Sequence, residues 1–506
     1  YRIAHFKTAS ADKDAGAAFL KYKDFKPYVD YFNSMEDENI AQAIPNARAS
    51  QWMEENIPLF ECSQKNFEEM YYYRWWTLRK HIKETPVGYG MTEFLVNRSY
   101  ADKYNLIACA IGHHIYESRW LRNPEYLNQI IHTWYRGNEG GPMAKMTKFS
   151  SWNADAILGR YMVDGNKEFL LDMVKDLEAE YARWEKTNRL PNGLYWQGDV
   201  QDGMEESISG GRRKQYARPT INSYMYGNAK ALSLIGIMTG DEGMAMKYGL
   251  KADSIKTLVQ DKLWNTDHHF FETMRGDASA EVREAIGYIP WYFNLPDASS
   301  KYTVAWKEVM DEKGFSAPYG LTTAERRHPE FRTHGVGKCE WDGAIWPFAS
   351  AQTLTAMANF MNNYPQTVLT DSVYFHHMER YVESQHHRGR PYIGEYLDEV
   401  TGYWLKGDQE RSRYYNHSTF NDLMITGLIG LRPRMDNTVE VNPLIPEGKW
   451  DYFCLDNVLY HGRNLTILWD KDGSRYQRGK GLHIYVDGKE VGHADTLTRV
   501  LCENVL

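Results

Sequence analysis

The segment 195–207 gathers acidic side chains behind two aromatic residues, a combination that can supply an acid catalyst. It reads Tyr-Trp-Gln-Gly-Asp-Val-Gln-Asp-Gly-Met-Glu-Glu-Ser, with four carboxyl groups within eight residues. Because like charges this close repel one another, one carboxyl group should keep its proton near neutral pH if the loop is buried. A general acid needs that property. The alternatives are a solvated acidic loop and a structural calcium site, which Asp-x-x-Asp-Gly faintly resembles.

The segment 391–404 offers a second set of carboxylates among aromatic residues and glycines. It reads Pro-Tyr-Ile-Gly-Glu-Tyr-Leu-Asp-Glu-Val-Thr-Gly-Tyr-Trp. An inverting glycosidase needs a second carboxylate across the sugar from the acid, far enough away to leave room for a water molecule. The alternative is the start of a helix with exposed acids. Together the two segments predict a carboxylate pair that cuts a sugar linkage without a metal.

Tryptophans accompany acidic or amide side chains at two further places, 148–155 and 339–347. The chain holds 16 Trp, 36 Tyr and 19 Phe residues, yet its mean hydropathy is −0.62. Indole and phenol rings match the flat apolar faces and polar rims of sugars, so a polar, aromatic-rich chain indicates a ring-lined cleft. The alternative is that each ring packs in the core and that Asp342 caps a helix.

Helices are expected to carry these segments. Apolar residues recur at i, i+3 and i+4 in eight stretches: 66–85, 101–114, 124–136, 167–187, 223–239, 241–263, 344–362 and 372–385. Polar loops that contain most of the tryptophan and carboxylate residues join these stretches. Regular helix pairs joined by long polar loops indicate a toroid of helical hairpins with its site at the loop-bearing end.

The pattern changes after residue 433. Residues 438–442, 465–469 and 482–486 alternate between apolar and polar, and Asp-Gly pairs at 472–473 and 487–488 predict turns between strands. We therefore expect three parts: an N-terminal extension (1–63), a helical catalytic domain (64–435) and a small β-rich region (436–506).

Composition excludes several classes of partner. The net charge is −8 over 506 residues and there is no long basic run, which argues against nucleic-acid binding. No stretch of about 18 apolar residues could span a bilayer. The first five residues, Tyr-Arg-Ile-Ala-His, do not resemble a secretion signal. The five scattered cysteines are expected to be small buried side chains. We expect a periplasmic or extracellular location, with the cytoplasm as the alternative.

Four motifs in order resemble the six-hairpin (α/α)6-barrel glycosidases near glycoside hydrolase family 63 and the mannosylglycerate-hydrolase-like domains. The family's Gly-x-Asp-(Asn/Asp)-(Ser/Ala) corresponds to 203–207, and its Trp-x-Gly-Pro-x-Trp to 341–346. Its late Glu-x-x-x-x-x-Thr-Gly corresponds to 395–402, and its Trp-Asp to Trp152-Asn153. The likeness covers about 64–432 and implies a mainly α-helical (α/α)6 toroid with a small C-terminal β-rich appendage.

The resemblance implies that Glu205 is the general acid and Glu395 the general base of an inverting reaction. The chain departs from the family pattern in having Glu for Asp at the acid position. Asp202 and Glu206 therefore stay open as alternative acids. Asn replaces the Asp of Trp-Asp, and Ala replaces the Pro of Gly-Pro. These changes leave the substrate less defined than the reaction.

The expected activity is exo-acting hydrolysis of oligosaccharides or glycan side chains, of the α-glucoside, α-mannoside or L-arabinofuranoside type. Substrate binding is expected from Trp75, Arg119, Trp152, Asn153, Trp196, Tyr224, Trp341, Asp342, Trp346 and His417. No cofactor or metal is expected in the reaction, although an acidic loop could hold a structural calcium ion. Two alternatives stay open: a polysaccharide lyase using residues near 386–392, and a carbohydrate-binding protein without activity. The sequence does not indicate an oligomeric state.

Overall fold

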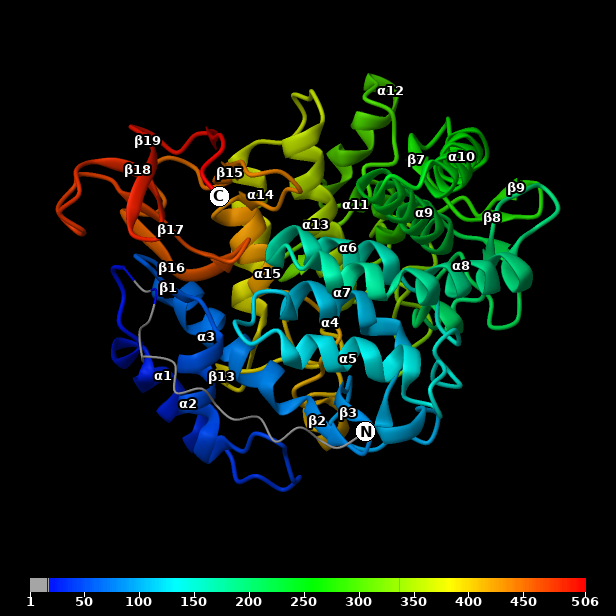
Figure 1. The fold of residues 1–506 in the computed structure, drawn as a ribbon. Coiled ribbons are helices and arrows are strands. Elements are labelled where there is room, and N and C mark those ends of the chain that lie inside the picture. Colours follow the sequence, from blue (N-terminus) through cyan, green and yellow to red (C-terminus); the bar gives the residue numbers. More distant parts are fainter. Residues whose placement is uncertain (1–15, 17, 336) are drawn as a thin grey trace.

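The computed structural model describes residue 16, residues 18–335 and residues 337–506. The first five residues, with their expected lack of a leader pattern, lie outside this part. Helices are the main regular structure of the molecule, and strands collect toward the C-terminus (Figure 1). The prediction of a mainly α-helical fold with a C-terminal β-rich region is confirmed. Within the described ranges, no helix combines the length and apolarity needed to cross a membrane.

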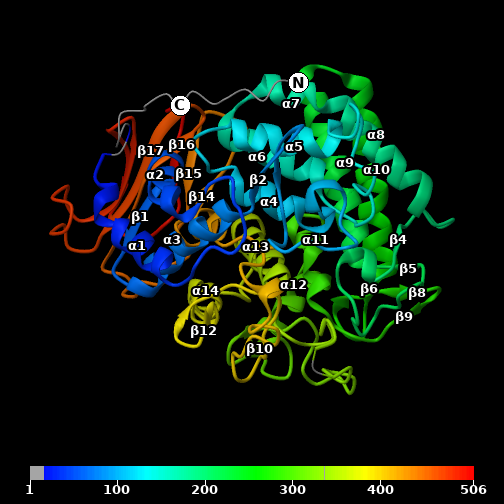
Figure 2. The ribbon, with the colours of Figure 1, turned by 90° about the horizontal axis from the view of Figure 1, so that it is seen from below.

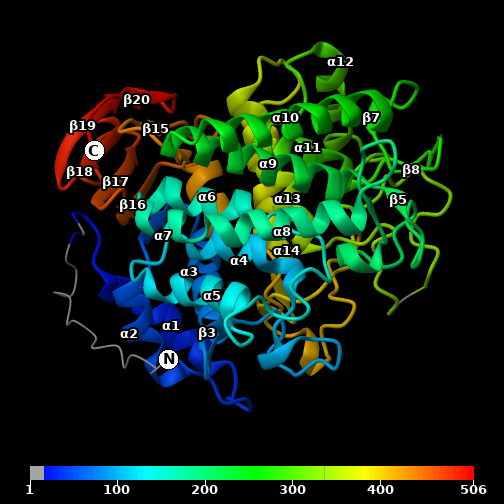
Figure 3. The same ribbon diagram turned by 45° about the vertical axis from the view of Figure 1, so that its right-hand side comes forward.

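Six helices close a ring in which each contacts the next and the last contacts the first. They are α4 (Ile111–Ser118), α6 (Asn153–Asp164), α9 (Pro219–Thr239), α11 (Ile289–Tyr292), α13 (Pro347–Asn363) and α15 (Asn421–Leu423). Further helices pack outside this ring: α8 (Val174–Asn188) and α10 (Glu242–Leu258) contact α9, and α14 (Asp371–Ser384) contacts α13. Figure 3 shows α6, α8, α9 and α10 running side by side. This arrangement of inner and outer helices is the predicted (α/α)6 barrel.

The remaining helices complete the outer layer and the N-terminal part. Their bounds are α1 (Lys26–Ser34), α2 (Asn46–Asn56), α3 (Lys65–Lys80), α5 (Glu125–Arg136), α7 (Lys167–Asp172), α8 (Val174–Asn188), α10 (Glu242–Leu258), α12 (Ser300–Thr303) and α14 (Asp371–Ser384). Helices α1 and α2 contact α3, so much of the N-terminal extension packs on the barrel.

Local residue choices fix where the long helices begin and end. Pro219 and Pro347 occupy the first positions of α9 and α13, where proline needs no N–H partner. Gly165 and Gly240 follow α6 and α9 with φ of 67° and 73°, a left-handed conformation that favours glycine. Asp241 then caps α10 by accepting a hydrogen bond from Met244 N.

Three predicted helices differ at their ends. The stretch 66–85 stops at Lys80, because Ile82–Thr85 pairs as β2 with β3 (Gly88–Met91). The stretch 101–114 holds two short 3-10 turns, Lys103–Asn105 and Ala108–Ala110, and is α-helical only from Ile111. The stretch 167–187 is interrupted at Met173. In the first case a strand pairing outweighs the helical periodicity.

The C-terminal region forms two antiparallel sheets. The larger has the order β1-β16-β17-β18-β19, and the smaller β14-β15-β20. Their strands are β1 (Leu59–Cys62), β14 (Leu431–Arg432), β15 (Val439–Val441), β16 (Tyr452–Tyr460), β17 (Arg463–Asp470), β18 (Gly481–Val486), β19 (Lys489–Ala494) and β20 (Val500–Cys502). The predicted turn at 487–488 joins β18 to β19. The expected boundary at 435/436 falls between β14 and β15.

Strand β1 comes from the N-terminal extension, for which the sequence predicts no strand. Leu59 pairs with Asp456 and Cys62 pairs with Phe453 on β16. Figure 2 shows β1 beside the C-terminal strands at one side of the barrel. The extension and the β-rich region therefore form one sheet.

Short strands form small antiparallel sheets in the loops between the barrel helices. They are β4 (Trp196–Gln197), β5 (Tyr216–Ala217), β6 (Trp264–Asn265), β7 (Phe270–Phe271), β8 (Met274–Arg275), β9 (Ala278–Ser279), β10 (Ser316–Ala317), β11 (Gly320–Leu321), β12 (His386–His387) and β13 (Arg390–Pro391). Of these, β4, β5, β8 and β9 belong to one four-stranded sheet. In Figure 2, β10 and β12 lie on the side of the barrel away from α7. The segments with the predicted catalytic residues belong to these loops.

Candidate active site

Glu395 lies in the loop after β13, and this loop is fastened to the segment that precedes α13. Leu397 forms isolated β-bridges with Ile345 and with Trp404. The bridge to Ile345 joins two of the sequence motifs, 341–346 and 395–402, although about 50 residues separate them in the chain. The predicted base therefore sits beside the predicted aromatic wall.

The Glu395 carboxylate is nearly buried and faces two cations. Its side chain is 6% exposed, and its Oε2 lies 3.3 Å from both Lys406 Nζ and Arg411 Nη2. The backbone N–H of Glu395 donates a hydrogen bond to Ser412 Oγ at 3.3 Å. Opposite charges at this range stabilise a carboxylate. This is the form that accepts a proton from water.

Glu205 follows a short 3-10 turn, Val200–Asp202, that ends at Gly203. Burial raises the pKa of Glu205 to about 7, and the negative charges of Glu395 and Asp199 add to the effect. The two predicted catalytic carboxyl groups are thus near enough for the charge of one to act on the other. Near neutral pH Glu205 can hold a proton and release it, as a general acid must.

Asp202, the first alternative acid, is committed to an ion pair inside the protein. Its Oδ2 lies 2.6 Å from Arg218 Nε, and both side chains are 0% exposed. Thr220 Oγ1 donates to the same oxygen at 2.6 Å, and Ser150 Oγ donates to the other. These contacts make Asp202 an anchor of the loop.

Glu206, the second alternative, lies toward the surface. It accepts a hydrogen bond from Arg212 at 2.7 Å, and this bond lowers the pKa of Glu206. A carboxyl group that ionises readily is a poor acid catalyst. Asp199 has a pKa raised by burial, but its side chain accepts from Val200 N and so closes the 3-10 turn. The geometry thus favours Glu205 among the four.

A third carboxyl group, which sequence analysis missed, adjoins this pair. Glu93 follows β3 and is buried, and Cys109 Sγ and Tyr415 OH donate hydrogen bonds to it at 2.8 and 2.9 Å. Burial raises the pKa of Glu93 to about 8, with further contributions from the charges of Glu395 and Glu205. A lone Glu in a loop gives no sequence signal, since its neighbours come from distant parts of the chain.

Aromatic rings line the site next to the base. Trp341 and Trp346 stack with ring centroids 4.7 Å apart, and Trp346 stacks on Tyr396 at 4.5 Å. Tyr396 directly follows Glu395, so the three rings form a continuous wall that ends at the predicted base. Each ring is at most 3% exposed, so the stack lies almost wholly inside the protein.

Buried polar atoms without a hydrogen-bond partner in the described part of the chain gather at this wall. They are Trp341 Nε1, Asp342 Oδ1, Trp346 Nε1, Tyr396 OH and His417 Nε2. Burial also lowers the pKa of His417 far below its usual range, so its ring is neutral. Buried polar groups normally have partners. This concentration therefore fits a ligand rich in hydroxyl groups, and it includes four of the ten predicted substrate-binding residues.

Trp152, by contrast, is packed in the core. It is fully buried, its Nε1 donates to Tyr292 OH at 3.1 Å, and it stands over Gly112 of α4. A Cβ at Gly112 would lie 2.1 Å from the indole ring, so the glycine makes room for this tryptophan. The structure gives Trp152 a packing role in place of the predicted sugar contact.

The other predicted substrate-binding residues are also held within the fold. Arg119 pairs with Asp422 at 2.8 Å. Asn153 donates to Glu180 at 2.9 Å and Tyr224 OH accepts from Gln352 at 2.8 Å. Trp75 is fully buried on α3, and Trp196 lies half-buried on β4. The structure places these five among the barrel helices and at the first hairpin.

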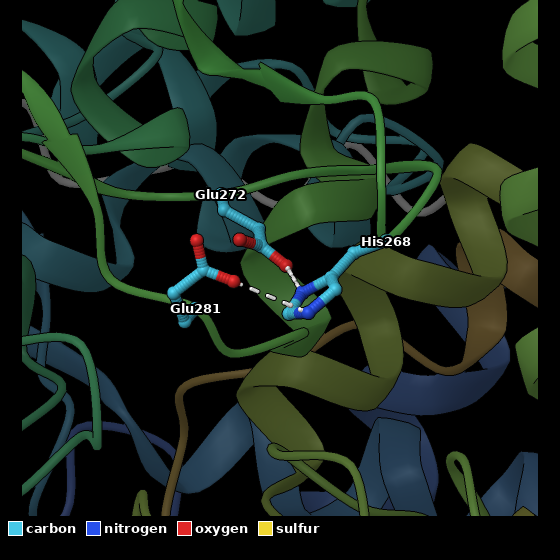
Figure 4. A group of neighbouring side chains, drawn as sticks. All are labelled: His268, Glu272 and Glu281. Atoms are coloured by element: carbon cyan, nitrogen blue, oxygen red, sulfur yellow. Dashed lines mark hydrogen bonds and ion pairs between the residues drawn. The ribbon is translucent and has the colours of Figure 1, made fainter.

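One group in the described residues has the spacing of a metal site: His268, Glu272 and Glu281 (Figure 4). His268 Nδ1 lies 2.5 Å from Glu272 Oε1, and Nε2 lies 3.2 Å from Glu281 Oε2. A histidine ring that bridges two carboxylates explains this arrangement. The acidic loop 199–206 is the alternative place for a structural calcium ion. There, Asp202 and Glu206 are already paired with arginines.

Of the residues near 386–392 that could serve a lyase, His387, Arg388 and Tyr392 line a cavity of about 490 Å³. Asp408 binds both His387 and Arg388, at 3.1 and 2.9 Å. His386 Nδ1 is 3.1 Å from Glu383 O. The basic side chains at this cavity are thus engaged by neighbours.

Two family models match successive parts of the chain. The mannosylglycerate hydrolase MGH1-like glycoside hydrolase domain matches residues 103–418. The C-terminal domain of glycosyl hydrolase family 65 matches residues 431–493. The first match covers most of the barrel and both predicted catalytic residues.

Three solved structures are similar over most of the chain. A protein described as a sialidase is 83% identical with a TM-score of 0.98 over 98% of this chain, but the match covers 46% of that protein. The GH63 mannosylglycerate hydrolase from Thermus thermophilus in complex with glucose is 11% identical with a TM-score of 0.53, over 70% of this chain and 99% of that one. The GH78 family rhamnosidase of Bacillus sp. GL1 is 11% identical with a TM-score of 0.56, over 85% of this chain and 41% of that one. The chain thus spans less than half of the sialidase, and the two distant structures share its fold.

Proposed function

The chain belongs to the mannosylglycerate hydrolase MGH1-like glycoside hydrolase family, and from this premise we propose that it removes terminal sugars by one inverting displacement. The observation that carries the proposal is the contrast between two carboxyl groups in one site. Glu205 has a pKa raised to about 7, and Glu395 is ion-paired with Lys406 and Arg411. One group can give a proton and the other can take one.

In the proposed reaction, Glu205 donates its proton to the glycosidic oxygen as the bond from this oxygen to the anomeric carbon breaks. Glu395 accepts a proton from a water molecule, whose oxygen bonds to the same carbon from the opposite face. The two products are a free sugar of inverted anomeric configuration and the shortened glycan. Glu205 ends as a carboxylate and Glu395 as a carboxylic acid, and exchange with solvent restores both.

The proposed substrates are α-glucosides, α-mannosides or L-arabinofuranosides at the ends of oligosaccharides or glycan side chains. The similar proteins are named as a mannosylglycerate hydrolase, a rhamnosidase and a sialidase. Because these names point to different sugars, the sugar has to be identified with a panel of substrates. The stacked rings of Trp341, Trp346 and Tyr396, with their free polar atoms, support a site for one sugar residue.

The test combines a substrate panel with two variants. Aryl glycosides and plant oligosaccharides are screened, and the anomer of the first product is read by NMR. Glu205→Gln and Glu395→Gln should each lower the rate on the best substrate by ~10²–10⁴, the usual contribution of general acid–base catalysis. Glu206→Gln, in the same loop but toward the surface, is the matched control and should keep its activity.

Each alternative has its own signature. Retention of configuration, or near-full turnover in both variants, would contradict the proposed mechanism. A product that absorbs in the ultraviolet would indicate a lyase. Binding of an oligosaccharide in calorimetry without release of reducing sugar would indicate a carbohydrate-binding protein.

A further inference from the structure

Two cationic side chains surround the single negative charge of Glu395, the predicted base. Lys406 and Arg411 both approach the same oxygen, Glu395 Oε2, at 3.3 Å. Charge-assisted hydrogen bonds between such groups are usually about 2.7–2.9 Å long. Both contacts are therefore longer than either cation would make with a carboxylate of its own.

The other contacts of these two cations do not neutralise them. Lys406 Nζ lies 3.9 Å from Cys339 Sγ and 5.0 Å from the centre of the Tyr396 ring. Arg411 Nε is buried and has no hydrogen-bond partner within the described ranges. The Lys406 side chain is 6% exposed and that of Arg411 is 26% exposed. The pair thus has unused donors at the edge of the site.

The neighbouring acids do not supply the missing negative charge. Burial raises the pKa of Glu205 to about 7 and that of Glu93 to about 8, so both are largely protonated in mildly acidic solution. Glu206 is paired with Arg212, and Asp342 Oδ2 lies 2.7 Å from His334 Nδ1. One positive charge beside Glu395 is left without a partner.

We propose that Lys406 and Arg411 bind the carboxylate of an acidic sugar, so that the enzyme prefers uronic acids to the corresponding neutral sugars. The guanidinium fork of Arg411 matches a carboxylate in shape and charge. When that carboxylate binds, the two cations are shared between it and Glu395. This inference rests on the proposed function, because it places the sugar against Glu395.

The test measures binding, so that it does not depend on turnover. Calorimetry compares D-glucuronate with D-glucose, D-galacturonate with D-galactose, and D-mannuronate with D-mannose. At least one acid should bind about tenfold more tightly than its neutral partner, as expected for one charge-assisted contact. The difference should shrink as salt rises from about 10 to about 500 mM, because the screening length falls from about 30 to about 4 Å.

Matched variants locate the effect. Arg411→Gln and Lys406→Met should each reduce the preference for the acid by about fivefold or more, while affinity for the neutral sugar changes little. Arg411→Lys keeps the charge and should restore part of the preference. Arg388→Gln removes an exposed arginine that pairs with Asp408, and it should bind the acid as the wild type does. Thermal unfolding confirms that each variant is folded.

The outcomes separate this inference from the proposed function. If no acid in the panel binds better than its neutral partner, or if the preference survives in both Arg411→Gln and Lys406→Met, the inference is wrong. Inverting hydrolysis of neutral glycosides alone would leave the proposed function standing without it. A preference lost in both variants supports the inference even if Glu205→Gln and Glu395→Gln show that the catalytic assignment fails.

Discussion

The loop with the acid, residues 199–206, and the loop with the base, residues 395–411, treat carboxyl groups in opposite ways. In the acid loop the arginines go to other residues, Arg218 to Asp202 and Arg212 to Glu206. Glu205 has no such arginine partner, and burial together with the negative charges of Glu395 and Asp199 raises its pKa. In the base loop two cations converge on Glu395. The same side-chain type thus becomes an acid or a base according to where the neighbouring cations go.

The strongest way to break this comparison is to remove the ion pair that anchors the acid loop. Asp202→Asn should destabilise the protein by about 3–5 kcal/mol, because it leaves Arg218 as a buried charge without its partner. Urea unfolding measures the change. Glu206→Gln is the matched control in the same loop, and its exposed pair should contribute about 0–1 kcal/mol. Equal stability of both variants would show that Asp202 is no anchor.

The second prediction concerns pH. Since Glu205 must be protonated to act, kcat/KM should fall about tenfold per pH unit above pH about 7. The folded pKa of Glu205 is raised from 4.5, so its contribution to stability is fully present below about pH 4.5 and lost as pH rises through about 7. The loss is on the order of 3 kcal/mol.

Glu205→Gln isolates that contribution. The free energy of unfolding of the wild type should drop relative to the variant between pH 4.5 and 7. Glu93 titrates in both proteins, and its pKa should be lower in the variant, because the Glu205 charge that helps to raise it is gone. Parallel pH dependences in urea unfolding would mean that Glu205 is not a buried acid. A rate profile that stays flat up to about pH 9 would place the proton donor elsewhere.

The smallest expected effect concerns the stacked rings beside Glu395. Trp346→Phe keeps a ring between Trp341 and Tyr396 but removes the free Nε1–H group. The lost hydrogen bond to a sugar hydroxyl should lower kcat/KM by about 2–10-fold, since one such bond is worth about 0.5–1.5 kcal/mol. Trp152→Phe is the control: it should lower the melting temperature and leave KM unchanged. An increase of KM in Trp152→Phe instead would return that residue to the sugar site.

Local patterns in the sequence were enough to predict a toroid of helical hairpins, and the resemblance to a family's motifs implied the two catalytic residues. Amphipathic periodicity depends only on neighbours along the chain, and α5, α9, α13 and α14 begin and end close to the predicted limits. The order of the motifs singled out Glu205 and Glu395. The choice of an acid among the four carboxyl groups needed the structure. Arg212 pairs with Glu206 and Arg218 pairs with Asp202, and both arginines lie outside the motif.

Long-range contacts account for what the sequence did not reveal. Trp152 and Trp346 are each the residue directly before a helix, yet only Trp152 of the two stands over a glycine of another helix. Glu93 joins the site through Tyr415, more than 300 residues away. Lys406 and Arg411 follow the base motif as ordinary polar residues in a loop, and only the folded loop brings them to Glu395.

Strand β1 sets a time order for assembly. It pairs with β16, which lies almost 400 residues later in the chain. At about 5–20 residues per second, protein synthesis needs roughly 20–80 s to cover that distance. During this interval β1 has been synthesised but its partner strand has not. The residues of β1, which are buried in the folded protein, therefore have no strand to pair with. Docking of the last sheet is therefore a late event of folding, and it is the step at which a nascent chain most needs protection from its neighbours.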